Sequence, residues 1–167
     1  MLRFSGALMI CLCCIWAGFS AADRLRRRRD FLVRFGTSLA VLETEIEFGR
    51  RTLAAIFSGM DTDGLLYGFY SRCAGKVADM GIKRAWSEAA DAVSGRAALT
   101  DGDREVIRSL GSELGMSDVM GQKRAIERTS ELLSERAAEA GADCERLTRV
   151  YRGCGLLSGA FAVLMLM

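Results

Sequence analysis

The sequence predicts an all-α protein: an antiparallel helical bundle between an N-terminal transmembrane helix and a short C-terminal apolar helix. The chain has no proline, and its middle is rich in Ala, Leu, Arg and Glu, so local propensity favours uninterrupted helices. Both ends are uncharged and apolar, and the body between them shows no strand-like alternation. We therefore divide the chain into an N-terminal membrane helix (1–22), a cytoplasmic bundle (23–152) and a C-terminal membrane helix (153–167).

The N-terminal apolar stretch, Phe4 to Ala22, holds nineteen residues without a charge. A helix of that length reaches roughly 28 Å, close to the hydrocarbon thickness of a bilayer. Five arginines follow within six positions: Arg24, Arg26, Arg27, Arg28 and Arg29. Because basic residues are retained on the cytoplasmic side of membranes, this cluster predicts an external N-terminus and a cytoplasmic body.

A cleaved signal peptide is the alternative interpretation, since Ser20-Ala21-Ala22 has the small residues of a cleavage site. Only Arg3 precedes the apolar run, and a mature chain would begin with an arginine-rich block that resists export. We favour a retained anchor. The alternative is an exported helical protein with a cleaved signal peptide and a C-terminal membrane tail.

The C-terminal stretch, residues 153–167, is also uncharged. Fifteen residues reach only about 22 Å as a helix, which is short for a span. The basic residues before it are Arg146, Arg149 and Arg152. They place positive charge on the same side as the first cluster, so both termini are expected outside. Gly155 and Gly159 form a GxxxG, which lets helices pack closely in lipid.

Helical periodicity predicts the first half of the body. Apolar residues recur at three- and four-residue steps over 30–51, which predicts a helix continuing the N-terminal stretch. In this helix Glu43 and Glu47 share one face, Glu45 points nearly opposite, and Glu47 is expected to pair with Arg51. A short helix is predicted over 52–60, and longer amphipathic ones over 66–80 and 83–93.

Capping signals predict the second half of the body. Thr100 is expected to cap a helix that ends near Gly115. Gly111 lies within that helix, where close approach of a neighbouring helix or simple tolerance would explain it. Ser117 is expected to cap the longest helix, from Asp118 to about residue 152. Its seven-residue seam comprises Ile126, Leu133, Ala140 and Leu147, interleaved by Ser130, Ala137, Cys144 and Tyr151.

The composition argues against several classes of function. The chain has no histidine, the commonest general base and metal ligand, and its six cysteines form no C-x-x-C pair. We therefore expect no enzymatic activity, metal or cofactor. The arginine block lacks interleaved aromatic residues and adjoins an apolar stretch, so it predicts contact with anionic lipid headgroups rather than nucleic acid.

Three stretches carry a resemblance to a known family. They are Leu42-Glu-Thr-Glu-Ile-Glu-Phe-Gly49, Ala85-Trp86-Ser-Glu-Ala89, and a run from Leu99 through Asp103-Arg-Glu105, Leu110-Gly111, Leu114-Gly115 and Ser117-Asp118 to Gln122. In residues, order and spacing they resemble the stage III sporulation protein AB family of endospore-forming bacteria. The sequence departs from that family at Arg51-Thr52-Leu53, which lacks the usual proline, so a helix break there is in doubt. Phe48 replaces the usual tyrosine.

The resemblance implies a non-enzymatic platform protein in the mother cell, on the outer forespore membrane. The family's body is similar to the cytoplasmic domain of the type II secretion platform protein. The implied partners are a cytoplasmic ATPase of the secretion type and other subunits of a channel between mother cell and forespore. We expect the partner surface to comprise Glu43, Glu45, Glu47 and Arg51, with the corner formed by Gly111, Gly115, Ser117 and Asp118.

Overall fold

The computed structural model describes residues 2–48, 51–60, 62–116 and 118–166, with the side chains of 20–150 among them. These residues form six α-helices and no strand, which confirms the all-α class. The helices are α1 (Leu2–Phe48), α2 (Leu53–Gly59), α3 (Gly64–Met80), α4 (Ile82–Ser94), α5 (Asp101–Glu113) and α6 (Val119–Leu166).

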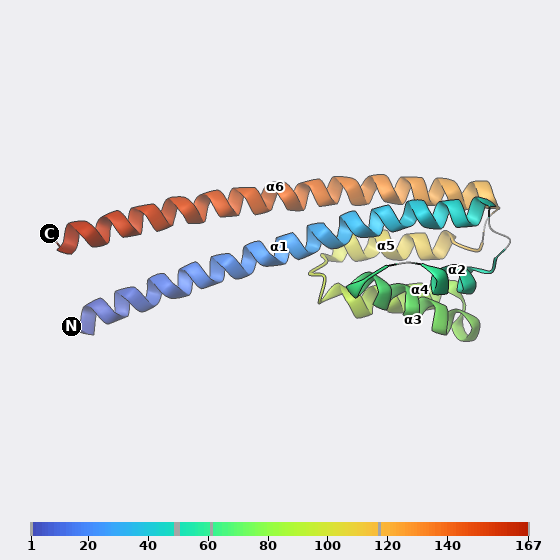
Figure 1. The fold of residues 1–167 in the computed structure, drawn as a ribbon, viewed down its shortest axis with the longest axis horizontal. Coiled ribbons are helices and arrows are strands. Elements are labelled where there is room, and N and C mark those ends of the chain that lie inside the picture. Colours follow the sequence, from blue (N-terminus) through green and yellow to red (C-terminus); the bar gives the residue numbers. More distant parts are fainter. Residues whose placement is uncertain (1, 49–50, 61, 117, 167) are drawn as a thin grey trace.

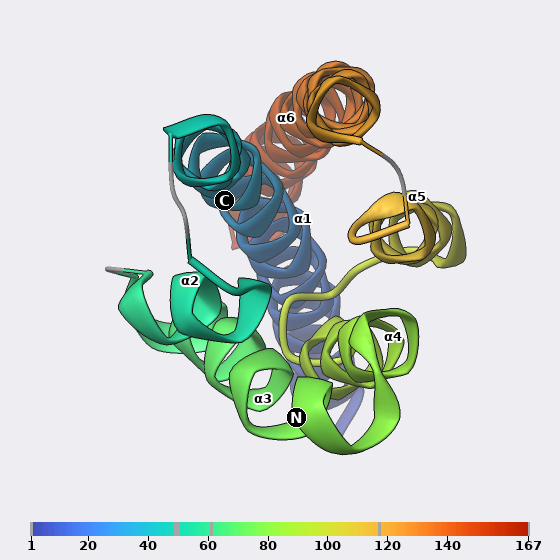
Figure 2. The same cartoon turned by 90° about the vertical axis from the view of Figure 1, so that its right-hand side faces the viewer.

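The two longest helices, α1 and α6, form an antiparallel pair that runs the length of the molecule (Figure 1). The four shorter helices pack beneath one half of this pair, and beyond them α1 and α6 continue together towards the two chain ends. Viewed from the opposite end, the bundle is a ring of helices in which α5 lies next to α6 and α3 next to α4 (Figure 2). Both termini therefore lie at the same end of the fold.

The C-terminal stretch is not a separate short helix, so that part of the predicted architecture is wrong. Helix α6 continues without a break from the bundle through Gly153 to Leu166. A helix that is already nucleated extends at little cost per residue, and glycines inside it cost only about 1 kcal/mol each against alanine. With no proline in the chain, nothing in this stretch stops the helix.

The membrane segments predicted at 1–22 and 153–167 lie almost wholly outside the residues whose side chains the structure describes, as do Gly155 and Gly159. Over the part that is described, no helix has both the length and the apolar character needed to span a bilayer.

The helix ends follow local capping chemistry. The Thr52 hydroxyl accepts a hydrogen bond from the Ala55 N–H at 3.4 Å, so α2 begins after a real break without proline. Thr100 caps α5 as predicted. Gly115 follows that helix with a φ of +76°, a conformation that favours glycine. The Asp118 side chain accepts a hydrogen bond from the Gly121 N–H at 3.0 Å, and α6 starts at Val119; Ser117, the predicted cap, lies outside the described residues.

Five aromatic side chains form the centre of the core. Phe69 packs edge-on against Trp86 with ring centroids 4.8 Å apart, and Phe35 packs edge-on against Phe69 at 5.1 Å. Phe57 and Tyr70 complete the cluster, which joins α1, α2, α3 and α4. The buried Tyr70 hydroxyl has a hydrogen-bond partner, since it lies 2.8 Å from the Ser38 hydroxyl. Burial raises the pKa of Tyr70.

Gly111 explains how α5 joins this core. Its position lies directly over the Trp86 ring, and a Cβ added there would overlap the indole. The Trp86 Nε1 donates a hydrogen bond to the Ile107 carbonyl at 2.7 Å, one turn earlier on α5. Of the two explanations left open for this glycine, the structure supports close approach, and the approaching group is the Trp86 side chain of α4.

Substituting Gly111→Ala should lower the free energy of unfolding by about 1–3 kcal/mol, because overpacking against Trp86 outweighs the gain in helix propensity. Gly75→Ala on α3, which meets nothing within 4 Å, is the control and should be neutral or slightly stabilising. Urea unfolding of the full chain in detergent, followed by circular dichroism, measures both. Equal effects of the two substitutions would contradict the packing account.

A buried ion pair attaches α1 to α5. The Arg28 Nε lies 2.6 Å from Asp103 Oδ2 and its Nη2 3.0 Å from Oδ1, with both side chains almost fully enclosed. The Asp103 carboxylate also accepts from the Thr100 N–H at 2.9 Å, completing a capping box. Burial acts to raise the pKa of Asp103, but the hydrogen bonds from Arg28 and Thr100 outweigh it and hold that pKa below its usual range.

Breaking the pair with Asp103→Asn should destabilise the protein by about 3–5 kcal/mol, because the buried Arg28 charge then keeps only a 3.9 Å contact with the exposed Glu139. Since the folded-state pKa of Asp103 lies below the unfolded one, its contribution is fully present above about pH 4 and is lost as the pH falls through the folded-state value. The wild type should therefore lose more stability on acidification than Asp103→Asn. If the unfolding midpoints of the wild type and Asp103→Asn fall in parallel as the pH is lowered, the Asp103 carboxylate does not stabilise the fold in this way.

Candidate functional site

The candidate functional site is the end of the bundle opposite the chain termini, which faces the viewer in Figure 2. Here α1 and α5 end while α2 and α6 begin. We call it the bundle tip. It comprises Glu43, Glu45, Glu47, Phe48, Arg51, Gly115, Met116, Asp118, Met120 and Lys123.

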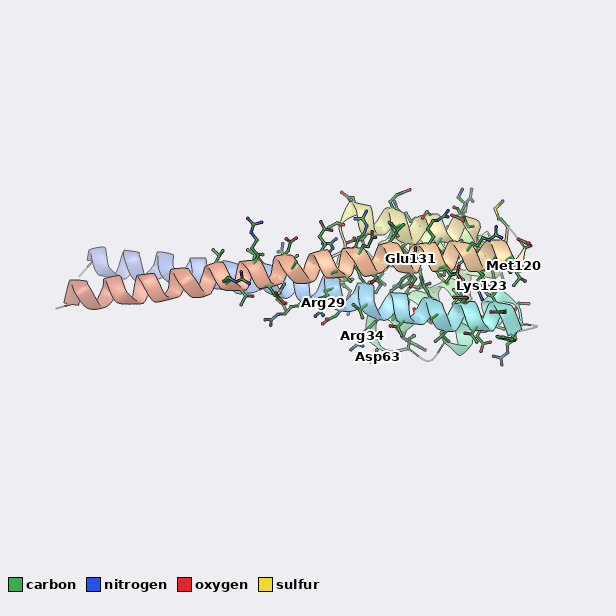
Figure 3. The ribbon with its side chains drawn as sticks, turned by 90° about the horizontal axis from the view of Figure 1, so that it is seen from above. Arg29, Arg34, Asp63, Met120, Lys123 and Glu131 are labelled. Atoms are coloured by element: carbon green, nitrogen blue, oxygen red, sulfur yellow. The ribbon has the colours of Figure 1, made fainter. Side chains whose placement is uncertain are left out.

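Charged side chains at the bundle tip link α1 to α6. Lys123 Nζ lies 3.1 Å from a Glu43 carboxylate oxygen and 3.0 Å from a Glu47 oxygen, which confirms that these glutamates share a face. The hydrogen bonds to Glu47 and then Glu43 raise the pKa of Lys123. Figure 3 labels Lys123 near the start of α6, close to α1. Two carboxylates against one ammonium leave the patch acidic.

The predicted pair between Glu47 and Arg51 is not formed. Helix α1 ends at Phe48, so Arg51 no longer lies one helical turn beyond Glu47. Arg51 instead lies 4.0 Å from Glu45, on the side of α1 away from Lys123. Both members of this pair are substantially exposed, so it contributes little to stability.

Large apolar side chains are exposed at the same end. Phe48 is 79% exposed, Met116 78% and Met120 56%. Single exposed apolar residues are ordinary, but three at one end of a small bundle are typical of a contact surface. Met116 and Met120 were not predicted as site residues. Their position in the sequence, at the junction between two predicted helices, could have indicated that no helical face buries them.

The structure brings most of the predicted partner surface together and separates the rest. Gly115 and Asp118 are exposed at the bundle tip, whereas Gly111 is buried against Trp86 and has a packing role. Ser117 is outside the described residues.

The topology arginines lie at the other end of the bundle. Arg24, Arg26, Arg27 and Arg29 are exposed there, while Arg28 is buried, which its basic neighbourhood gave no reason to expect.

The structure offers little for catalysis among the residues it describes. No group of three or more His, Cys, Asp or Glu in this part of the chain is placed to hold a metal ion. Cys73 is fully buried, and burial raises its pKa to about 12, which keeps the thiol protonated at neutral pH. Its surroundings are those of a core residue.

Known proteins with similar sequences identify the family of this chain. The family model for stage III sporulation protein AB matches residues 3–167. The chain belongs to the stage III sporulation protein AB family. A curated relative, stage III sporulation protein AB of Bacillus subtilis (strain 168), is 25% identical over 172 residues and covers 100% of both chains. No solved structure matches the chain significantly. Family membership supports a role in sporulation.

Removing an exposed ring at the bundle tip should leave the fold intact. Phe48→Ser should change the free energy of unfolding by less than about 0.5 kcal/mol, because the ring is outside the core. Phe35→Ala, in the centre of the aromatic cluster, should cost about 3–5 kcal/mol. Denaturant titrations of the two variants compare them directly. A large loss of stability in Phe48→Ser would show that the ring is a packing element.

Proposed function

We propose that the chain is a non-enzymatic membrane scaffold of the sporulation channel between mother cell and forespore, and that its bundle tip contacts a cytoplasmic secretion-type ATPase. The observation that carries this proposal is the polarity of the fold. Both uncharged ends of the chain lie at one end of the α1–α6 pair, and an exposed acidic and apolar surface lies at the other. Such an arrangement presents a contact surface away from a membrane.

Membrane attachment through a retained anchor is part of the proposal. Helix α1 continues without a break through Ser20-Ala21-Ala22, and the Cys144 thiol on α6 lies 3.7 Å from the Ala22 carbonyl. Cleavage after Ala22 would therefore cut a helix inside its packed region. This supports the retained anchor over the exported alternative. The location that follows is the mother-cell side of the outer forespore membrane, with the body in the cytoplasm.

The bundle tip suits a protein partner by its chemistry. Phe48, Met116 and Met120 supply apolar area, and methionine side chains adapt to different partner shapes. The excess of carboxylates around Lys123 would attract a basic patch on the ATPase and steer its approach. Other channel subunits are expected to contact the remaining faces.

Charge reversal tests the contact. Glu43→Lys with Glu47→Lys should reduce capture of the ATPase from sporulating cells at least about ten-fold, since like-charge contacts at an interface cost several kcal/mol. Glu131→Lys with Glu135→Lys is the matched control. These two exposed glutamates lie one turn apart on α6 and are not part of the bundle tip; Glu131 is labelled in Figure 3. This control should bind normally.

A charge swap separates docking from folding. Adding Lys123→Glu to the reversed pair restores opposite charges between α1 and α6 while inverting the charge that a partner meets. If the bundle tip docks the ATPase, the swapped protein should be folded by circular dichroism and still fail to bind. Recovery of binding in the swap would assign these residues a purely structural role.

A further inference from the structure

A basic cavity lies at the opposite end of the bundle from the tip. It has a volume of about 610 Å³ and lies between α1 and the connection from α4 to α5. In Figure 1 that connection passes beneath α1 at the end of the bundle nearer the chain termini. The basic lining residues are Arg24, Arg27, Arg28, Arg96 and Arg104, and none of the described lining residues is acidic.

The arginines of this cavity are unequally neutralised. Three of them form ion pairs: Arg28 with the buried Asp103, Arg27 with the exposed Asp23, and Arg104 with Asp101 at the surface. Among the described residues, no carboxylate lies within ion-pair distance of Arg24 or Arg96. Two guanidinium groups at one cavity therefore lack an anionic partner.

Two local features set the lining of this cavity apart from an ordinary surface. The Arg104 Nε is buried and has no hydrogen-bond partner, which is unusual for a folded protein. Ala98, also in the lining, has a φ of +55°, a conformation that is strained for a residue with a Cβ. The loop is held in this shape by hydrogen bonds from the Ala97 N–H to the Val93 carbonyl and from the Leu99 N–H to the Ser94 carbonyl, each 2.9 Å long.

Position and chemistry together define the ligand. Guanidinium groups present N–H donors in a fork that matches phosphate oxygens. Arg24 follows the uncharged stretch that ends at Ala22, so the cavity lies about one helical turn from the proposed membrane boundary. We propose that this cavity binds the phosphate of an anionic phospholipid headgroup, with Arg24 and Arg96 as its principal contacts. This site rests on the membrane attachment proposed above, and it would fix the bundle's height and rotation at the bilayer surface.

The test uses the full chain purified in a neutral detergent. Short-chain phosphatidylglycerol, phosphatidylcholine of the same chain length and inorganic phosphate are titrated separately, with the unfolding temperature as the readout. We expect phosphatidylglycerol to raise that temperature and the other two to have little effect. Arg24→Gln with Arg96→Gln should weaken the apparent affinity for phosphatidylglycerol at least about ten-fold, since each basic side chain near anionic headgroups adds appreciable attraction.

Arg72→Gln with Arg84→Gln is the control, because it removes the same charge from exposed positions on α3 and α4. It should respond like the wild type. The proposal would be overturned if the control lost as much affinity for phosphatidylglycerol as Arg24→Gln with Arg96→Gln, or if phosphatidylglycerol did not change the unfolding temperature of the wild type. A response to inorganic phosphate as large as that to phosphatidylglycerol would also overturn it, in favour of a soluble phosphate. Extraction of the chain from membranes by detergent but not by salt checks the anchor separately, so that failure of the cavity and failure of the anchor are distinguishable.

Discussion

The Arg28–Asp103 ion pair fixes the position of α5, and the rest of the bundle depends on that position. One carboxylate does three things: it closes the capping box at the start of α5, it binds α1 through Arg28, and it lies 3.6 Å from Arg136 of α6. With its start fixed, α5 places Gly111 over Trp86. Trp86 in turn packs against the aromatic rings of α1, α2 and α3. A polar contact at one end thus sets the register of an apolar core.

The same contact separates two ends of the molecule that differ in chemistry. On one side of it lie the exposed arginines and the uncharged ends of α1 and α6, and on the other lies the bundle tip. An antiparallel helix pair is stiff along its axis and joins the two ends directly. A force or displacement at the bundle tip would therefore reach the opposite end of the molecule through α1 and α6, which suits the proposed scaffold between a cytoplasmic motor and a membrane channel.

Sequence patterns were sufficient for the helices but not for their charged contacts. Periodicity and capping residues predicted α3, α4 and α5, because those signals are local. The burial of Arg28 was not predictable in the same way. It lies among four exposed arginines, and its partner Asp103 is 75 positions away, so only the tertiary fold brings the two together. The short C-terminal helix was not found as a separate element, because α6 continues through this proline-free stretch to Leu166. The predicted ion pair between Glu47 and Arg51 was wrong because α1 ends at Phe48, so Arg51 does not lie one helical turn beyond Glu47.

In the proposed topology, a membrane-bound α1–α6 pair holds the bundle in the cytoplasm. Cys73 and Cys144 are buried and make poor reporters, so the direct measurement uses Ser134→Cys, at an exposed position on α6. The background replaces the terminal cysteines with alanine, at Cys11, Cys13, Cys14 and Cys154. A membrane-impermeant maleimide should label the variant, in the membrane fraction, only after the cells are permeabilised. Equal labelling in intact cells would place the bundle outside and contradict the account.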